Sequence, residues 1–216
     1  ITRPVALLTY HPPTAEPNAP VGRWAAETAG AALAVCGTVI ATHPGMDEGR
    51  DEVLQALTDL AAAHSRLHLV AALGRDYPSV LAGVDVVVGN SSSGVIEAAT
   101  VHVPAVDVGE RQRGRLRGHN VVHSDEGRAP VEAALRTALS PSWQARTRAA
   151  TNPYGSGGAS ERIVAIVRQA AGGGRTKPFV DLLEQDADGE DAGDKSRQVA
   201  HRAGDRDTDT HPREAR

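Results

Sequence analysis

Cysteine is nearly absent, since Cys36 is the only one in 216 residues, which excludes an internal disulfide framework and a multi-cysteine metal site. Aromatic residues make up only 3% of the chain. We therefore expect a core of Ala, Val and Leu, and no platform for single-stranded nucleic acid, which needs aromatic stacking. No apolar run reaches the roughly 18 residues of a membrane span, and no basic stretch leads into an apolar one as in a secretory signal. We expect a cytoplasmic protein without a membrane partner.

An excess of basic charge is also lacking. The 23 basic and 27 acidic side chains leave a net charge of −4, which argues against nucleic acid as a partner. The nine histidines show no zinc-binding spacing such as His-Glu-x-x-His, so no metal site is predicted. The chain begins at Ile1, and the apolar segment 5–8 follows almost at once. We expect that residues preceding it are missing.

The composition changes near residue 172. Between Gly172 and Arg216, 11 acidic and 8 basic residues occur in 45 positions, and aliphatic residues become scarce. Such a segment buries too little apolar surface to offset the entropy lost on ordering. We expect one folded domain over residues 1–183 and a disordered charged tail over 184–216, with the apolar cluster 179–183 docked on the folded body.

Short apolar runs alternate with helical patterns through residues 1–171. The predicted strands are 5–9, 35–41, 67–73, 84–88, 104–108 and, in shorter form, 121–122; the predicted helices are 22–33, 49–63, 77–81, 94–100, 130–139 and 160–170. Strands that alternate with helices predict an α/β fold, a doubly wound parallel sheet of the Rossmann-like kind. Ligands of such sheets bind beyond the carboxyl ends of the strands, so the loops that follow strands form the candidate site.

The loop after the strand 84–88 carries the strongest chemical signal, Gly-Asn-Ser-Ser-Ser-Gly-Val-Ile-Glu over residues 89–97. Small residues at a helix start expose unpaired amides to an anion, and Ser91 and Ser92 add hydroxyl donors. Glu97, expected in the first turn of that helix, suits the two hydroxyls of a ribose. The alternative is an ordinary serine cap with a carboxylate favoured by the helix dipole.

The same loop approaches the Gly-x-Ser-x-Gly nucleophile elbow of serine hydrolases, with Ser91 as the nucleophile. Asp107 follows, and His119 or His123 comes after it, in the order of a hydrolase triad. The fifth position of the motif is Ser93 instead of glycine, although the tight turn of the elbow needs small residues. A serine hydrolase therefore remains an alternative function.

Four arginines occupy alternate positions after the strand 104–108: Arg111, Arg113, Arg115 and Arg117. Arginine pairs with phosphate oxygens through its planar fork, and in a doubly wound sheet this loop should lie near the serine loop. The alternative is a solvated loop or an ion-pair network. We expect one arginine to contact a ligand phosphate and the others to be structural.

The loops after the strands 5–9 and 35–41 carry two further candidates. His11 lies directly before two prolines, at a position from which an imidazole can hydrogen-bond a ligand or move a proton. A structural histidine is the alternative. Asp47, in the second loop, could instead cap the helix that follows. No Gly-x-Gly-x-x-Gly fingerprint follows the first strand, which argues against NAD, and no cofactor is predicted.

Together these segments resemble the C-terminal half of the hydrolysing UDP-N-acetylglucosamine 2-epimerases, enzymes of the sialic-acid pathway. The resemblance covers residues 1–183 and rests on the segments 9–12 (Thr-Tyr-His-Pro), 44–49, 89–98, 109–115, and 152–155 with 159–163. The segments 89–98 and 109–115 are specific to the hydrolysing branch of the family. The non-hydrolysing branch usually has a different loop in place of 89–98 and lacks the arginine stretch.

The resemblance implies a two-domain enzyme built like the B-type glycosyltransferases, of which this chain is the Rossmann-like C-terminal domain. It implies that His11 lies at the reacting sugar as a catalytic residue, that Ser91 and Ser92 hold the pyrophosphate, and that Glu97 binds the ribose. Arg111 matches an arginine of the nucleotide site. The implied reaction removes the proton at sugar C2, eliminates UDP and adds water to the glycal, giving N-acetylmannosamine without a redox cofactor.

Asn90, Gly94 and Asp47 are further candidates for substrate contact. Two features depart from the family. Gly45 stands where the family often has Asn, so a side chain that could reach the ligand is missing. The N-terminal half, which carries most of the family's acid/base carboxylates, has no counterpart in this chain.

We therefore expect the missing N-terminal domain as a partner, a UDP-sugar as substrate and assembly into a homo-oligomer, as the family tends to assemble. One alternative is a non-catalytic fragment that binds UDP or a protein partner, and the other is the Ser91 hydrolase. The sugar is left open between N-acetylglucosamine and a bacillosamine-type variant.

Overall fold

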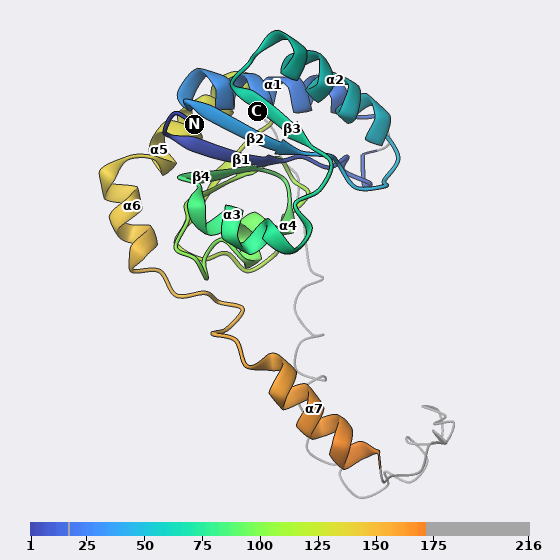
Figure 1. The fold of residues 1–216 in the computed structure, drawn as a ribbon, viewed down its shortest axis with the longest axis vertical. Helices are drawn as coiled ribbons and strands as arrows, with labels where there is room; N and C mark the ends of the chain where they lie inside the picture. The colour runs from blue at the N-terminus through green and yellow to red at the C-terminus, as the bar shows by residue number, and fades with distance from the viewer. Residues whose placement is uncertain (17, 172–216) are drawn as a thin grey trace, which may run out of the picture. The chain divides into compact units, whose positions relative to one another are not determined.

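The computed structural model describes residues 1–16 and 18–171 (Figure 1). Its strands are β1 (Val5–Thr9), β2 (Thr38–Thr42), β3 (Leu67–Val70), β4 (Val86–Gly89), β5 (Ala105–Val108) and β6 (Val121–Ser124). Its helices are α1 (Val21–Val35), α2 (Arg50–Ala63), the 3-10 turn η1 (Gly74–Asp76), α3 (Tyr77–Gly83), α4 (Ser92–Ile96), α5 (Arg128–Ala138), α6 (Pro141–Arg148) and α7 (Ala159–Ala170).

The six strands form one parallel sheet in the order β3-β2-β1-β4-β5-β6. The chain order reverses between β1 and β4, and a switch point of this kind leaves the two loops after these strands beside each other. Thr9 and Gly89 pair in register, so both strands end at the same level. The predicted doubly wound, Rossmann-like sheet is confirmed, and the short sixth strand belongs to it.

Helices cover both faces of the sheet (Figure 1). Ala6 and Leu8 of β1 point to the face on which α1, α2 and α5 pack, whereas Val5 and Leu7 point to the face that Leu81 of α3 covers. Successive side chains of a strand point to opposite faces, and burial of both faces explains why β1 is apolar throughout. Both cores consist mainly of Ala, Val and Leu, as the low aromatic content predicts.

Several element boundaries differ from the sequence prediction. Val35 ends α1 instead of starting β2, and β3 stops at Val70, before η1. Helix α6 is not predicted, because its polar sequence has no apolar period. Its start signal was nevertheless present: the Ser140 hydroxyl oxygen accepts a hydrogen bond from the Trp143 N–H (3.3 Å), and Pro141 follows the cap.

The chain divides into two units, residues 1–157 and 158–216. In the second unit the structure describes helix α7 up to its end near residue 171. The predicted tail over 184–216, the docked cluster 179–183 and the domain boundary at 183 lie outside the described residues. In the described ranges, no helix combines the length and the apolar composition of a membrane span.

The core arrangement predicts a large loss of stability for Leu8→Ala. The Leu8 side chain is 0% exposed, so its truncation should lower the free energy of unfolding by about 2–5 kcal/mol through lost burial and a cavity. Urea denaturation measures the change. Leu116→Ala is the matched control, because Leu116 is 63% exposed and its loss should cost at most about 0.5 kcal/mol. Equal effects of the two substitutions would contradict the assigned packing of β1.

Candidate functional site

The loops after β1 and β4 are joined by Asn90, a residue that is only 1% exposed. Its Oδ1 accepts a hydrogen bond from the His11 N–H (2.7 Å), and its Nδ2 donates to the His11 carbonyl oxygen (2.7 Å). Gly89 permits this close approach, because its φ is 128° and a Cβ there would lie 2.1 Å from the Thr9 carbonyl oxygen. Both ends of the Asn90 amide are occupied, so we assign Asn90 to positioning rather than to substrate contact.

The arginine loop reaches the same residue. Nη1 of Arg111 (3.1 Å) and Nε2 of Gln112 (2.8 Å) both donate to the Asn90 carbonyl oxygen. Gln112 is 1% exposed, whereas Arg111 is half-buried and has further guanidinium N–H groups to donate. The predicted proximity of the arginine loop and the serine loop is confirmed.

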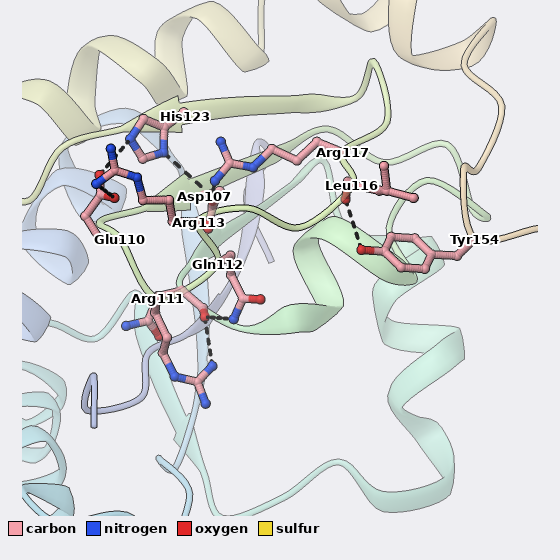
Figure 2. Close-up of polar contacts among 10 residues, drawn as sticks. Asp107, Glu110, Arg111, Gln112, Arg113, Leu116, Arg117, His123 and Tyr154 are labelled. Atoms are coloured by element: carbon pink, nitrogen blue, oxygen red, sulfur yellow. Dashed lines mark hydrogen bonds and ion pairs between the residues drawn. The ribbon is translucent and has the colours of Figure 1, made fainter. Parts of the chain in front are cut away.

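Two of the other arginines of this loop pair with carboxylates (Figure 2). Nη2 of Arg117 lies 2.6 Å from Oδ2 of the buried Asp107, and Nη1 of Arg113 lies 3.0 Å from Oε2 of Glu110. Burial raises the pKa of Asp107, and the Arg117 guanidinium opposes that rise. The expected ion-pair network is thus present beside a single arginine that contacts the serine loop.

Histidine and acid side chains meet at the end of this network. His123 Nδ1 lies 3.7 Å from Asp107 Oδ2, and His123 Nε2 lies 3.9 Å from Glu110 Oε1. Figure 2 shows the imidazole between the two acids. Within the part of the chain that the structure describes, no group of three or more His, Cys, Asp and Glu side chains is arranged to hold a metal ion.

The serine loop forms the start of α4. Ser91 is the N-cap residue, and its Oγ accepts a hydrogen bond from the Ser93 N–H (3.4 Å). Ser91 and Ser92 are half-buried, whereas Ser93 is buried and its hydroxyl bonds to the Tyr77 hydroxyl. The capping alternative therefore holds at Ser91. An accepting hydroxyl keeps its own proton to donate, so the cap leaves Ser91 able to bind an anion.

Glu97 and Gly94 lie differently from the sequence expectation. The prediction that Glu97 occupies the first helical turn is wrong, because α4 already begins at Ser92 and spans only five residues. Glu97 is the C-cap residue and is exposed. Gly94 faces the sheet, where a Cβ would lie 3.5 Å from the Cβ of Ala105. Packing of α4 therefore explains Gly94 better than substrate contact does.

His11 contacts the loop after β2. Its ring Nδ1 accepts a hydrogen bond from the Gly45 N–H (2.8 Å). Burial lowers the pKa of His11, the Arg111 guanidinium lowers it further, and Asp47 acts in the opposite direction. Asp47 is not the cap of α2, since that cap is Gly49. The structure thus brings His11 and Asp47 together with the serine and arginine loops.

A buried pair that the sequence did not indicate lies beneath these loops. The hydroxyl of Tyr10, which is 0% exposed, donates to Oε1 of Glu126 (2.8 Å). Burial raises the pKa of Glu126 to about 7, and Glu16 and Glu27 contribute in the same direction. The two partners are 116 positions apart, so no local pattern reveals the pair. Tyr10 precedes His11, and Glu126 follows β6.

The geometry does not favour the serine hydrolase. Ser91 has φ −72° and ψ 144°, an ordinary extended conformation rather than the strained turn of a nucleophile elbow. Asp107 pairs with Arg117 and lies beside His123. Among the described residues, the only hydrogen bond of the Ser91 hydroxyl is the one from the Ser93 N–H.

Glu126 predicts a pH dependence of stability. Its pKa is about 7 in the folded chain and about 4.3 in an unfolded one, so only the folded state holds the proton between these values. The contribution of the Glu126 proton to the free energy of unfolding is therefore complete below about pH 4.3, and it is lost as the pH rises towards 7. Glu126→Gln, which keeps an acceptor for Tyr10, should flatten this slope in urea denaturation between about pH 5 and 8. With Glu132→Gln as the matched control, an unchanged slope in Glu126→Gln would refute the assignment.

The sequence comparisons identify related proteins. The sequence model of UDP-N-acetylglucosamine 2-epimerase matches residues 1–168. A Legionella pneumophila protein named UDP-N,N'-diacetylbacillosamine 2-epimerase (hydrolyzing) is 33% identical over 168 residues, which are 76% of this chain and 42% of that protein. A Neisseria meningitidis serogroup B UDP-N-acetylglucosamine 2-epimerase is 30% identical over 132 residues, or 61% of this chain and 34% of that protein. This chain therefore spans less than half the length of these relatives.

Solved structures share the fold at low sequence identity. The S. aureus MnaA–UDP co-structure superposes with a TM-score of 0.61 and 18% identity over 82% of this chain and 48% of that one. The N. meningitidis UDP-GlcNAc 2-epimerase bound to UDP-GlcNAc gives a TM-score of 0.60 and 14% identity over 76% of this chain and 44% of that one. With the sequence match over most of its length, this chain belongs to the UDP-N-acetylglucosamine 2-epimerase family.

Proposed function

We propose that this chain is the UDP-binding, C-terminal half of a hydrolysing UDP-N-acetylglucosamine 2-epimerase. One observation carries the proposal: His11 and Arg111 both bond to Asn90, the residue directly before Ser91, at the switch point of the sheet, where doubly wound folds bind nucleotides. Arg111 offers a positive charge and several N–H donors to a pyrophosphate, and Ser91 and Ser92 add hydroxyl donors. Arg113 and Arg117 pair with acids, and of the other two arginines Arg111 is the one whose guanidinium bonds to the serine loop, so we assign Arg111 to the ligand.

Glu97 is proposed to bind the ribose. It is exposed at the C-terminal end of α4, away from the first amides of that helix. A carboxylate in this place is separated from the pyrophosphate and can accept hydrogen bonds from both ribose hydroxyls. Its position past the helix end therefore suits the ribose better than the predicted first-turn position would.

The proposed reaction consumes UDP-N-acetylglucosamine and water. A base removes the proton at sugar C2, the bond from C1 to the diphosphate oxygen breaks, and UDP leaves with the electron pair. Water then adds across the resulting C1–C2 double bond and yields N-acetylmannosamine. We place the acid/base carboxylates on the N-terminal half that this chain lacks, in a two-domain enzyme that acts in the cytoplasm as a homo-oligomer. By itself the chain then binds UDP without turning it over.

The sugar is a separate question. The Legionella relative is named for UDP-N,N'-diacetylbacillosamine and the Neisseria relative for UDP-N-acetylglucosamine, so both sugars are candidates. UDP is common to both substrates, and the residues proposed here contact that shared part.

Calorimetric titration with UDP, with UMP and ADP as controls, tests the proposal. We expect UDP to bind more tightly than either control, because UMP lacks the second phosphate and ADP carries a purine in place of the uracil of the proposed ligand. Glu97→Ala should weaken UDP binding by about 1–3 kcal/mol, or roughly 5- to 150-fold, the scale of lost charge-assisted hydrogen bonds. Glu132→Ala, on α5, is the matched control.

Three outcomes would contradict parts of this account. The absence of UDP binding by the folded chain would contradict a preformed nucleotide site. An affinity unchanged by Glu97→Ala would remove the ribose assignment. Sustained release of UDP from UDP-N-acetylglucosamine by this chain alone would show that its own residues complete the reaction.

A further inference from the structure

The segment 152–155 (Asn-Pro-Tyr-Gly) supplies none of the proposed ligand contacts, but it bonds to two of the loops that do. Its backbone forms a turn, which the Gly155 N–H closes by donating to the Asn152 carbonyl oxygen (3.1 Å). Gly155 has a φ of 107°, a conformation that favours glycine. Asn152 and Tyr154 therefore project from a turn of defined geometry.

Asn152 bonds to the chain on both sides of Glu97. Its Nδ2 donates to the Ile96 carbonyl oxygen (2.8 Å) and to Oγ1 of Thr100 (2.7 Å). The Thr100 N–H in turn donates to the Glu97 carbonyl oxygen (2.9 Å), and the Glu97 N–H donates to the Ser93 carbonyl oxygen (3.0 Å). The peptide units before and after Glu97 are therefore both held in place.

The same turn reaches the arginine loop. The Tyr154 hydroxyl donates to the Leu116 carbonyl oxygen (3.1 Å), as Figure 2 shows. The Tyr154 N–H donates to Oδ1 of Asn152 (2.9 Å), so the residue that holds the end of α4 is bonded to the residue that holds the arginine loop. The turn thus braces the end of α4 against the loop 111–117.

This brace matters because α4 by itself gives Glu97 little support. The helix has only five residues, and a helix so short is unstable without tertiary contacts. The Glu97 side chain is exposed, so the direction of its carboxylate depends on its backbone. A backbone that is already fixed loses less entropy when the carboxylate accepts hydrogen bonds from a ligand.

We infer that Asn152 is a positioning residue that sets Glu97 for the two hydroxyls of the ligand ribose, so that the preference for ribose over deoxyribose depends on Asn152. This inference rests on the proposed ribose contact of Glu97. Both ends of the Asn152 amide are engaged within the chain, so Asn152 acts through Glu97 and not by contact with the ligand.

Amide hydrogen exchange, resolved by NMR, tests the brace without any ligand. Asn152→Ala removes both bonds from Nδ2, so we expect the Glu97 and Thr100 N–H groups to exchange at least about fivefold faster than in the wild type. The amides of β1 should keep their rates, because the sheet stays folded. Asn18→Ala, at an exposed position, is the matched control. Exchange of both amides at the wild-type rate in Asn152→Ala would overturn the inference.

Titration with UDP and with 2′-deoxy-UDP tests the role in the site. We expect the wild type to bind UDP at least about fivefold more tightly than 2′-deoxy-UDP, the scale of a lost hydrogen bond to a charged group. Asn152→Ala should reduce this preference to less than about twofold. Tyr154→Phe, which keeps the backbone N–H bonded to Asn152, should retain it.

The outcomes separate the inference from the proposed function. A preference that is kept in Asn152→Ala, or lost equally in Tyr154→Phe, would overturn the positioning role. A wild type that binds both nucleotides equally would contradict the ribose contact of Glu97, and one that binds neither would contradict the nucleotide site. Both of these results count against the proposed function, while the exchange rates still decide whether Asn152 holds Glu97.

Discussion

The candidate site depends on the burial of one carboxamide. Asn90 is withdrawn from water, and a buried amide destabilises the fold unless its donors and acceptor are paired. The His11 backbone pairs with both ends of that amide, and the carbonyl oxygen of Asn90 accepts from Arg111 and Gln112. The loops after β1, β4 and β5 are therefore held in place by one residue. Gly89 allows it, because any side chain there would collide with β1.

Around that residue the charges are distributed unevenly. Asp107 and Glu110 engage Arg117 and Arg113, while Arg111 reaches the serine loop. Burial and the Arg111 guanidinium lower the pKa of His11, and its Nδ1 accepts a hydrogen bond from the Gly45 N–H. A chain with a net charge of −4 thus still places the Arg111 guanidinium beside the serine loop at this edge of the sheet. Such an edge suits a diphosphate because the donors are fixed before the ligand arrives.

The sequence predicted the parts that depend on local patterns. Apolar runs separated by helical periods were enough for the parallel sheet, and small polar residues after β4 marked the site. Contacts between residues distant in the sequence could not be predicted from local patterns: the Tyr10–Glu126 pair joins positions 116 apart, and the bond from Arg111 to the Asn90 carbonyl oxygen joins positions 21 apart. The error at Glu97 arose because Ser91, not a later serine, caps α4, which moves the helix start back to Ser92. Helix α6 was missed because its apolar period is absent.

The central claim is that Asn90 assembles a nucleotide site from separate loops. The UDP dissociation constant of Asn90→Asp tests it most directly, because the aspartate keeps the size and the acceptor of the side chain but cannot donate to the His11 carbonyl oxygen. Asn18→Asp, at an exposed position, controls for the added charge. We predict that Asn90→Asp weakens UDP binding at least about tenfold, the scale of a lost buried hydrogen bond, while Asn18→Asp does not. Equal UDP affinity in Asn90→Asp and the wild type would contradict the claim.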